Sequence, residues 1–230
     1  MNFHEFADKT ELAAHLAAHI AEQLTARMKS SEARVRLLLS GGSTPAPAYT
    51  NLANKEVIWP RLDVGLVDDR WVDESHSASN AALIRRSFLE AGAHAAQFTP
   101  MKTVHHVPAD AVSEVNARYE RFSDPDIVVL GMGPDGHTAS WFPNSRGLAR
   151  AMSPETREVV ASIDATGSDV AGVVPLRMTL TLPPLVRADQ VYLLITGDEK
   201  KKVLEDAAAN LPIHQLIAAR DNNMEVFWSP

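Results

Sequence analysis

Short apolar segments separated by helical patterns are the feature that most limits what this chain can fold into. The four clearest segments cover residues 35–39, 64–67, 127–130 and 191–195. Each is too short for a helix and almost continuously apolar, as expected of a strand buried on both faces of a parallel sheet. The helical patterns that alternate with them cover residues 8–28, 79–91, 109–122 and 199–209. This alternation predicts an α/β fold, modified Rossmann-like, with a mostly parallel sheet and helices on both faces.

The remaining sequence adds two weaker strand candidates and shows no sign of a boundary between domains. Glu158–Ala161 and Met224–Trp228 have strand-like composition, and we expect the second to be a late strand or an edge strand. No internal repeat or long linker interrupts the chain, and the proline-rich positions 45–47 and 183–184 are too short to separate domains. We therefore expect residues 1–230 to form a single domain.

Composition and charge narrow the classes of function. The chain has 22 Lys and Arg against 29 Asp and Glu, a net charge of −7, which disfavours nucleic-acid binding but not the binding of a small anion by local groups. The absence of cysteine excludes disulfides and thiol nucleophiles. The N-terminal residues do not resemble a secretory signal, and no apolar run approaches the roughly 18 residues of a membrane span. We expect a cytoplasmic protein without membrane partners, a monomer or a weak homo-oligomer.

The loop after the first apolar segment has the composition of a phosphate-binding loop. In open α/β sheets ligands bind at the carboxyl ends of the strands. Gly41 and Gly42 would let backbone N–H groups approach a ligand there, while Ser43 and Thr44 would add hydroxyl donors at the start of a helix. The alternative is a plain strand-to-helix turn that needs glycine. The loop lacks the lysine of a Walker A motif, which disfavours nucleoside triphosphates.

A second glycine-rich loop follows the strand at 127–130 and leads to a histidine. Gly131–Gly136 matches the GxGxxG dinucleotide pattern, but Pro143 comes too soon for the helix that this motif requires. We interpret the loop instead as presenting His137 at the mouth of the sheet, with Asp135 near enough to orient it. Histidine titrates near neutral pH and suits a general base. A structural or merely exposed histidine is the alternative.

Charged residues near other strands are further candidates. Asp68-Asp69-Arg70 follows the second apolar segment, where it is either a solvated turn or a site at which Arg70 binds phosphate or substrate oxygens. Arg177, and Lys200 just after the strand at 191–195, are candidate anion ligands or simple surface charges.

Other polar groups fit less well. His15 and His19 have the i, i+4 spacing of a metal pair without an acidic partner between them, so a solvated helix face explains them better, and we expect no metal site. The adjacent pair at 105–106 shows no ligand partners. Neither Ser43 nor Ser140 lies in the GxSxG elbow of a serine hydrolase.

Taken together and in order, these segments resemble the 6-phosphogluconolactonase family, which shares its fold with glucosamine-6-phosphate deaminases/isomerases. The matching pieces span residues 40 to 200 and are Ser40–Pro45, Asp68–Val72 with Ser79-Asn80, Gly131–Pro143, Arg177–Thr181 and Ile195–Lys200. Any one of these segments is weak evidence for the family, but the set of them in this order is specific to it.

The resemblance implies hydrolysis of 6-phosphoglucono-δ-lactone to 6-phosphogluconate, the second step of the oxidative pentose phosphate pathway, with no metal or cofactor. His137 would take a proton from the attacking water, and Arg70 would serve the phosphate or the oxyanion. Asp68 and Asp135 match acids found in both branches of the family. The family usually has Glu where Asp69 stands. The residues expected to hold the phosphate are Gly41, Gly42, Ser43, Thr44, Arg177 and Lys200.

Two alternatives stay open at this point. The deaminases carry a Glu five residues after the histidine, where this chain has Phe142, and a phenyl ring cannot relay a proton. A non-catalytic sugar-phosphate sensor with the same fold is the other alternative. The presence of both His137 and Asp135 favours an enzyme, because a sensor has no use for a base.

Overall fold

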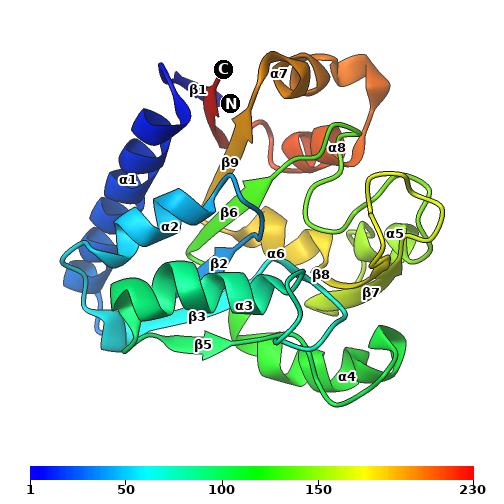
Figure 1. Ribbon diagram of the computed structural model, residues 1–230, viewed down its shortest axis with the longest axis horizontal. Coiled ribbons are helices and arrows are strands. Elements are labelled where there is room, and N and C mark those ends of the chain that lie inside the picture. Colours follow the sequence, from blue (N-terminus) through cyan, green and yellow to red (C-terminus); the bar gives the residue numbers. More distant parts are fainter.

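The computed structural model describes all 230 residues, arranged in two sheets whose buried residues belong to one hydrophobic core. The larger sheet has seven strands in the order β1-β10-β9-β6-β2-β3-β5, and every neighbouring pair is parallel (Figure 1). Its strands are β1 (Asn2–Glu5), β2 (Val35–Leu39), β3 (Leu62–Leu66), β5 (Gln97–Thr99), β6 (Ile127–Gly131), β9 (Gln190–Thr196) and β10 (Glu225–Ser229).

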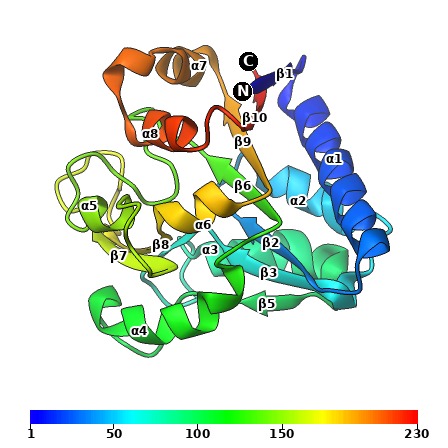
Figure 2. The same cartoon turned by 180° about the vertical axis from the view of Figure 1, so that it is seen from behind.

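Helices cover both faces of this sheet, as the sequence predicts. In Figure 1 helices α2 and α3 lie in front of the strands, whereas Figure 2 shows α6 in front of the opposite face. The helices are α1 (Lys9–Ser30), α2 (Ala46–Ala53), α3 (Asn80–Ile84), α4 (Pro108–Tyr119), α5 (Leu148–Ala151), α6 (Leu182–Arg187), α7 (Asp198–Glu205) and α8 (Pro212–Ala219). None of them is long and apolar enough to cross a membrane.

Helix α1 shows how the local sequence sets an element. The carboxylate of Asp8 accepts hydrogen bonds from the backbone N–H groups of Thr10 and Glu11, at 2.7 and 2.9 Å, and so caps the helix where the sequence predicts its start. The apolar residues that recur every four positions are buried, among them Leu16, Ile20 and Leu24. They pack α1 against α2 and the sheet.

The smaller sheet is antiparallel and corrects one prediction. It has the order β4-β8-β7, with β4 (Asp68–Arg70), β7 (Val160–Asp164) and β8 (Leu176–Leu180). Asp68–Arg70 is therefore a strand and not a charged turn. Only Val67 separates it from β3, so the chain passes directly from one sheet to the other. Pairing with β8 supplies the extended conformation that three charged residues do not favour by themselves.

Other elements differ from the predictions in smaller ways. The helix predicted at 79–91 begins as α3, capped by Ser79, and continues as a π-helical segment over Arg85–Ala93. The strand predicted at Glu158–Ala161 lies two residues further on, as β7. Strand β10 is the last strand of the chain, as one of the two expectations has it, and it is not an edge strand, because β1 pairs with it on its outer side. The patterns at 109–122 and 199–209 each end in a 3₁₀ turn, at Glu120–Phe122 and Ala207–Ala209.

Candidate active site

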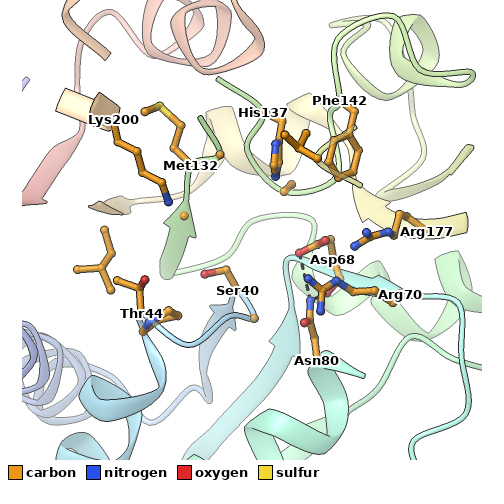
Figure 3. Close-up of a pocket in the computed structure, with 17 residues that line it drawn as sticks. Ser40, Thr44, Asp68, Arg70, Asn80, Met132, His137, Phe142, Arg177 and Lys200 are labelled. Carbon is orange, nitrogen blue, oxygen red and sulfur yellow. Dashed lines mark hydrogen bonds between the residues drawn. The ribbon is translucent and has the colours of Figure 1, made fainter. Parts of the chain in front are cut away.

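A cavity of about 260 Å³ lies beyond the carboxyl ends of β2, β6 and β9, where the large sheet meets the small one (Figure 3). The strand order reverses between β2 and β6, since the chain first builds outward from β2 and later outward from β6. Open α/β sheets bind ligands at such a switch point. The residues that line the cavity are Ser40, Gly41, Thr44, Pro45, Asp68, Arg70, Asn80, Gly131, Met132, Gly133, His137, Ala139, Phe142, Val170, Arg177, Leu194 and Lys200.

His137 is held by the loop that follows β6. Its Nδ1 lies 2.5 Å from Oδ1 of Asp135, which also accepts a hydrogen bond from the His137 backbone N–H at 3.3 Å. Burial raises the pKa of Asp135, but the hydrogen bond and the charge of His137 outweigh it, so the pKa is lowered on balance. A carboxylate at Nδ1 fixes a proton there and leaves Nε2 as the basic nitrogen.

The glycine at position 133 is required for this arrangement. A Cβ on Gly133 would lie 2.2 Å from the His137 ring and 2.7 Å from the Asp135 carboxylate. The Gly133 backbone N–H also donates to the His137 carbonyl at 2.9 Å, which closes the loop. Of the glycines in the GxGxxG pattern, Gly133 thus makes room for the imidazole of His137, whereas Gly136 lies against Leu211.

Two arginines reach the cavity from directly opposite positions on neighbouring strands of the small sheet. Arg70 on β4 pairs in register with Arg177 on β8. Like charges opposite each other destabilise an antiparallel pair, and such a conflict is expected where an anion must bind. Arg177 is 4% exposed and donates to the carbonyls of Val174 and Ala171 at 2.9 and 2.7 Å. Burial lowers the pKa of its guanidinium to about 10, so the group stays protonated at neutral pH.

Asp68 joins the small sheet to the loop that carries His137. Its carboxylate accepts a hydrogen bond from the hydroxyl of Ser140 at 2.5 Å, and its backbone carbonyl accepts one from the amide of Asn80 at 2.8 Å. The Asn80 amide oxygen has no hydrogen-bond partner and lies against Gly41, where an added Cβ would be 1.8 Å away. Gly41 is therefore required by the packing of Asn80.

Asp69 points away from the cavity and is fully buried. Its carboxylate accepts hydrogen bonds from the backbone N–H groups of Asn80 and Ala81, at 2.7 and 3.2 Å, and so holds the first turn of α3. Burial, with a smaller contribution from the nearby charge of Asp68, outweighs these hydrogen bonds and raises the pKa of Asp69 to about 7.

The opposite side of the cavity is formed by the loop after β2 and by Lys200 in the first turn of α7. Figure 3 shows Lys200 on the same side as Thr44 and Ser40, and Arg177 on the far side next to Arg70 and Asp68. Burial, followed by the charge of Lys9, lowers the pKa of the Lys200 ammonium. The cavity thus has two cationic sides, with His137 between them.

Most of the predicted site residues come together here. Gly41, Thr44, Asp68, Arg70, His137, Arg177 and Lys200 line the cavity, and Asp135 supports His137 from outside it. Gly42 and Ser43 do not line it, and Ser43 is exposed to solvent. Asn80 and Phe142 also line the cavity, although no site role was predicted for them; both lie within the segments that carry the family resemblance.

The histidines set aside in the sequence lie elsewhere. His15 packs on Phe6, and His19 packs edge-on to Tyr192 with its Nε2 3.5 Å from a carboxylate oxygen of Glu225. His105 contacts the hydroxyl of Thr103 at 2.9 Å. None of these three groups lines the cavity.

The fold and the site define an α/β enzyme that applies acid–base chemistry to a small anionic substrate. Comparison with known proteins agrees. The family of glucosamine-6-phosphate isomerases/6-phosphogluconolactonase matches residues 7–228. The chain belongs to this family.

Several relatives and solved structures are similar over most of the chain. A 6-phosphogluconolactonase of Xylella fastidiosa (strain Temecula1) is 41% identical, covering 85% of this chain and 82% of the relative. One of Mesorhizobium japonicum is 34% identical over 100% of this chain and 95% of its own length. The crystal structure of a 6-phosphogluconolactonase from Shewanella baltica superposes with a TM-score of 0.92 at 31% identity, covering 100% and 98%. A monomeric glucosamine-6-phosphate deaminase shares the fold, with a TM-score of 0.76 at 16% identity.

Proposed function

We propose that this protein hydrolyses 6-phospho-D-glucono-1,5-lactone to 6-phospho-D-gluconate. The relatives that cover most of the chain at 34% and 41% identity are 6-phosphogluconolactonases. The observation that carries the proposal is a single imidazole on the cavity wall, held at Nδ1 by Asp135, with a phenyl ring instead of a second acid–base group beside it. A lactone needs a positioned base and a stabilised oxyanion, but no covalent nucleophile.

In the proposed reaction His137 acts first as base and then as acid. Its Nε2 accepts a proton from water as the water oxygen bonds to C1 of the lactone. The tetrahedral oxyanion then collapses, the bond from C1 to the ring oxygen breaks, and the imidazolium returns the proton to that oxygen. Asp135 stabilises the imidazolium between the two steps. General base catalysis of this kind contributes about 10²- to 10⁴-fold.

We propose that the phosphate occupies the side of the cavity formed by Thr44 and Lys200. A hydroxyl, a half-buried ammonium, and the small residues before α2 converge there. Backbone N–H groups and the start of a helix favour an anion in such a loop. Gly42 and Ser43 adjoin Thr44 in the same loop but do not line the cavity. Their contribution to the phosphate site therefore stays a prediction.

We propose that Arg177 and Arg70 face the carbonyl end of the lactone. Both lie across the cavity from Lys200, so a phosphate held by Lys200 and Thr44 places the ring carbonyl toward them (Figure 3). Cations fixed in a partly buried wall stabilise the oxyanion that forms on C1. This assigns Arg177 to the developing charge, instead of the phosphate contact suggested by the family resemblance.

The experiment that tests the function generates the lactone freshly from glucose 6-phosphate and follows 6-phosphogluconate with its dehydrogenase. Wild-type protein should accelerate hydrolysis above the spontaneous rate, and His137→Ala should lower kcat by about 10²- to 10⁴-fold. His94→Ala, at an exposed histidine, is the matched control and should retain full activity.

The two alternatives give different results in the same preparation. Release of ammonia from glucosamine 6-phosphate, without acceleration of lactone hydrolysis, would replace the lactonase proposal by the deaminase. Binding of 6-phosphogluconate with no turnover of either substrate would indicate a sensor. Lactone hydrolysis that survives in His137→Ala would keep the function and overturn the role of His137.

A further inference from the structure

Phe142 lies between the proposed base and one of the two arginines. Its ring centre is 4.2 Å from the centre of the His137 imidazole, with an angle of 35° between the ring planes. The guanidinium carbon of Arg177 lies 5.4 Å from the same phenyl ring. Phe142 is 2% exposed, lines the cavity, and comes from the loop that also carries His137 (Figure 3).

We propose that Phe142 is a positioning residue that fixes the plane of the His137 ring during lactone hydrolysis. The inference rests on the proposed function. Asp135 holds the imidazole at one nitrogen only, and a single hydrogen bond leaves the ring free to tilt about the bond that joins it to Cβ, because rotation about such a bond is loosely restricted. Contact with a flat ring restricts this tilt and keeps Nε2 directed at the substrate.

The surroundings of the imidazole support this role. Gly133 lies close beside the ring, where an added Cβ would be 2.2 Å from two of its atoms. Asp135 contacts Nδ1, and Phe142 packs on the ring with its plane tilted by 35°. Three contacts therefore define the ring position, of which only the Asp135 contact is polar. Replacing Phe142 by an aliphatic residue removes the flat contact and leaves the other two.

Phe142 also keeps the base and the guanidinium apart. The centre of its buried ring lies 4.2 Å from the imidazole centre of His137 and 5.4 Å from the guanidinium carbon of Arg177. A guanidinium over a phenyl ring is a favourable cation–π arrangement. Loss of the ring therefore disturbs the base and the proposed oxyanion ligand together, an effect on the chemical step and not on phosphate binding.

The test compares Phe142→Leu with Phe142→Tyr and with Phe122→Leu. Phe122 is also fully buried but packs on Tyr119 and does not line the cavity, so it controls for loss of a core phenyl ring. Phe142→Leu should lower kcat about tenfold or more, because small misplacements of a catalytic group are costly, with KM changed less than about threefold. Phe142→Tyr should restore kcat to within about threefold of wild type. Phe122→Leu should lower the melting temperature without lowering kcat.

An NMR measurement separates this proposal from the proposed function. The His137 ring protons should be shifted upfield by the stacked phenyl ring in wild type and in Phe142→Tyr, and should move downfield in Phe142→Leu. This result needs no turnover. If Phe142→Leu melts below the assay temperature, Phe142→Met replaces it in both experiments.

The proposal is overturned by any of three results. One is a kcat of Phe142→Leu within twofold of wild type. Another is a loss confined to KM. The third is a Phe142→Tyr variant as slow as Phe142→Leu while folded. A wild-type protein that does not accelerate lactone hydrolysis refutes the proposed function instead, and the ring-proton shifts then still report whether the Phe142 ring lies against the imidazole of His137.

Discussion

The two sheets of the molecule contribute different kinds of residues to the cavity, from different parts of their strands. The strands of the seven-stranded sheet that border it, β2, β6 and β9, are apolar and buried, and their functional groups lie in the loops beyond the strand ends. The three-stranded sheet carries charged residues within its strands, among them Asp68, Arg70 and Arg177. The large sheet therefore contributes loops at its strand ends to the cavity, and the small sheet contributes charged side chains from within its strands.

The difference between apolar and charged strands also affects how much each sheet contributes to the stability of the fold. Parallel strands that are buried on both faces gain stability from apolar burial without constraint from function. The small sheet instead places two arginines opposite each other, next to two adjacent carboxylates. Charged groups that are partly removed from water lower the stability of the fold unless they are paired with opposite charges. We therefore expect the charged groups of the small sheet to add less to the stability of the fold than the apolar strands of the large sheet do.

The largest difference between the sheets should appear in Arg177→Lys. Lysine keeps a positive charge on β8, but it cannot donate to the carbonyls of Ala171 and Val174 and to a substrate oxyanion at once. Loss of one oxyanion donor typically costs about 10²- to 10³-fold in kcat. We expect kcat to fall by about 10²-fold, with a smaller change in KM, measured with freshly generated lactone.

Arg187→Lys is the control, because Arg187 is at the exposed end of α6 and contacts Ser123 and Asp124. It should leave kcat and KM unchanged. If Arg177→Lys raises KM and leaves kcat intact, Arg177 binds the phosphate after all, and the division of the cavity into a phosphate side and a carbonyl side is wrong.

The opposite pattern is expected for Lys200→Ala, on the side that belongs to the large sheet. A charge-assisted hydrogen bond to the phosphate contributes about 1.5–3 kcal/mol, which corresponds to a rise of roughly 10- to 100-fold in KM. The effect on kcat should be smaller than on KM. Lys202→Ala removes a solvent-exposed ammonium from the same helix and serves as the control. Unchanged KM in Lys200→Ala would remove Lys200 from the phosphate site.

Whether a strand is apolar or charged also decides how well it could be predicted from the sequence. The limits of β2 were predicted correctly at Val35–Leu39, because an apolar run between polar residues carries the signal locally. Strand β4 was not predicted, because its three charged residues become a strand only through pairing with β8. Local pattern therefore located the apolar strands β2, β3, β6, β9 and β10 and, shifted by two residues, β7. It did not predict the short strands β1 and β5 of the large sheet or β4 and β8 of the small one.

The site followed a similar rule. His137 and Lys200 were found because they follow strands, where ligands bind. Asn80 was not assigned a role, since it reaches the cavity only through its contacts with Asp68 and Gly41, which come from two other segments. Gly42 was predicted from composition and does not line the cavity, so its part in the site stays a prediction. Positions that depend on contacts between distant segments lie beyond single-sequence reasoning.

The last expected effect is on stability and concerns Asp69, the fully buried carboxylate of the small sheet. Its pKa in the folded protein, about 7, lies above its ordinary value of 3.8, so the folded state binds the proton more tightly than the unfolded state. The stability gained from the protonated form is complete below about pH 4 and is lost as the pH rises toward 7. Within this window one pH unit changes the free energy of unfolding by at most about 1.4 kcal/mol.

Asp69→Asn should remove this dependence, because an amide does not titrate. Its single oxygen can still accept from the N–H group of Asn80, while the N–H group of Ala81, which donates to the other carboxylate oxygen, loses its acceptor. Urea unfolding at pH 5, 6, 7 and 8 measures it, with Asp198→Asn at an exposed position as the control for a change of net charge. We expect the stability of wild type to fall more steeply than that of Asp69→Asn between pH 5 and 7, and Asp198→Asn to follow wild type. Parallel curves for wild type and Asp69→Asn would show that Asp69 stays ionised in the folded protein, and that the small sheet bears its buried charge without this cost.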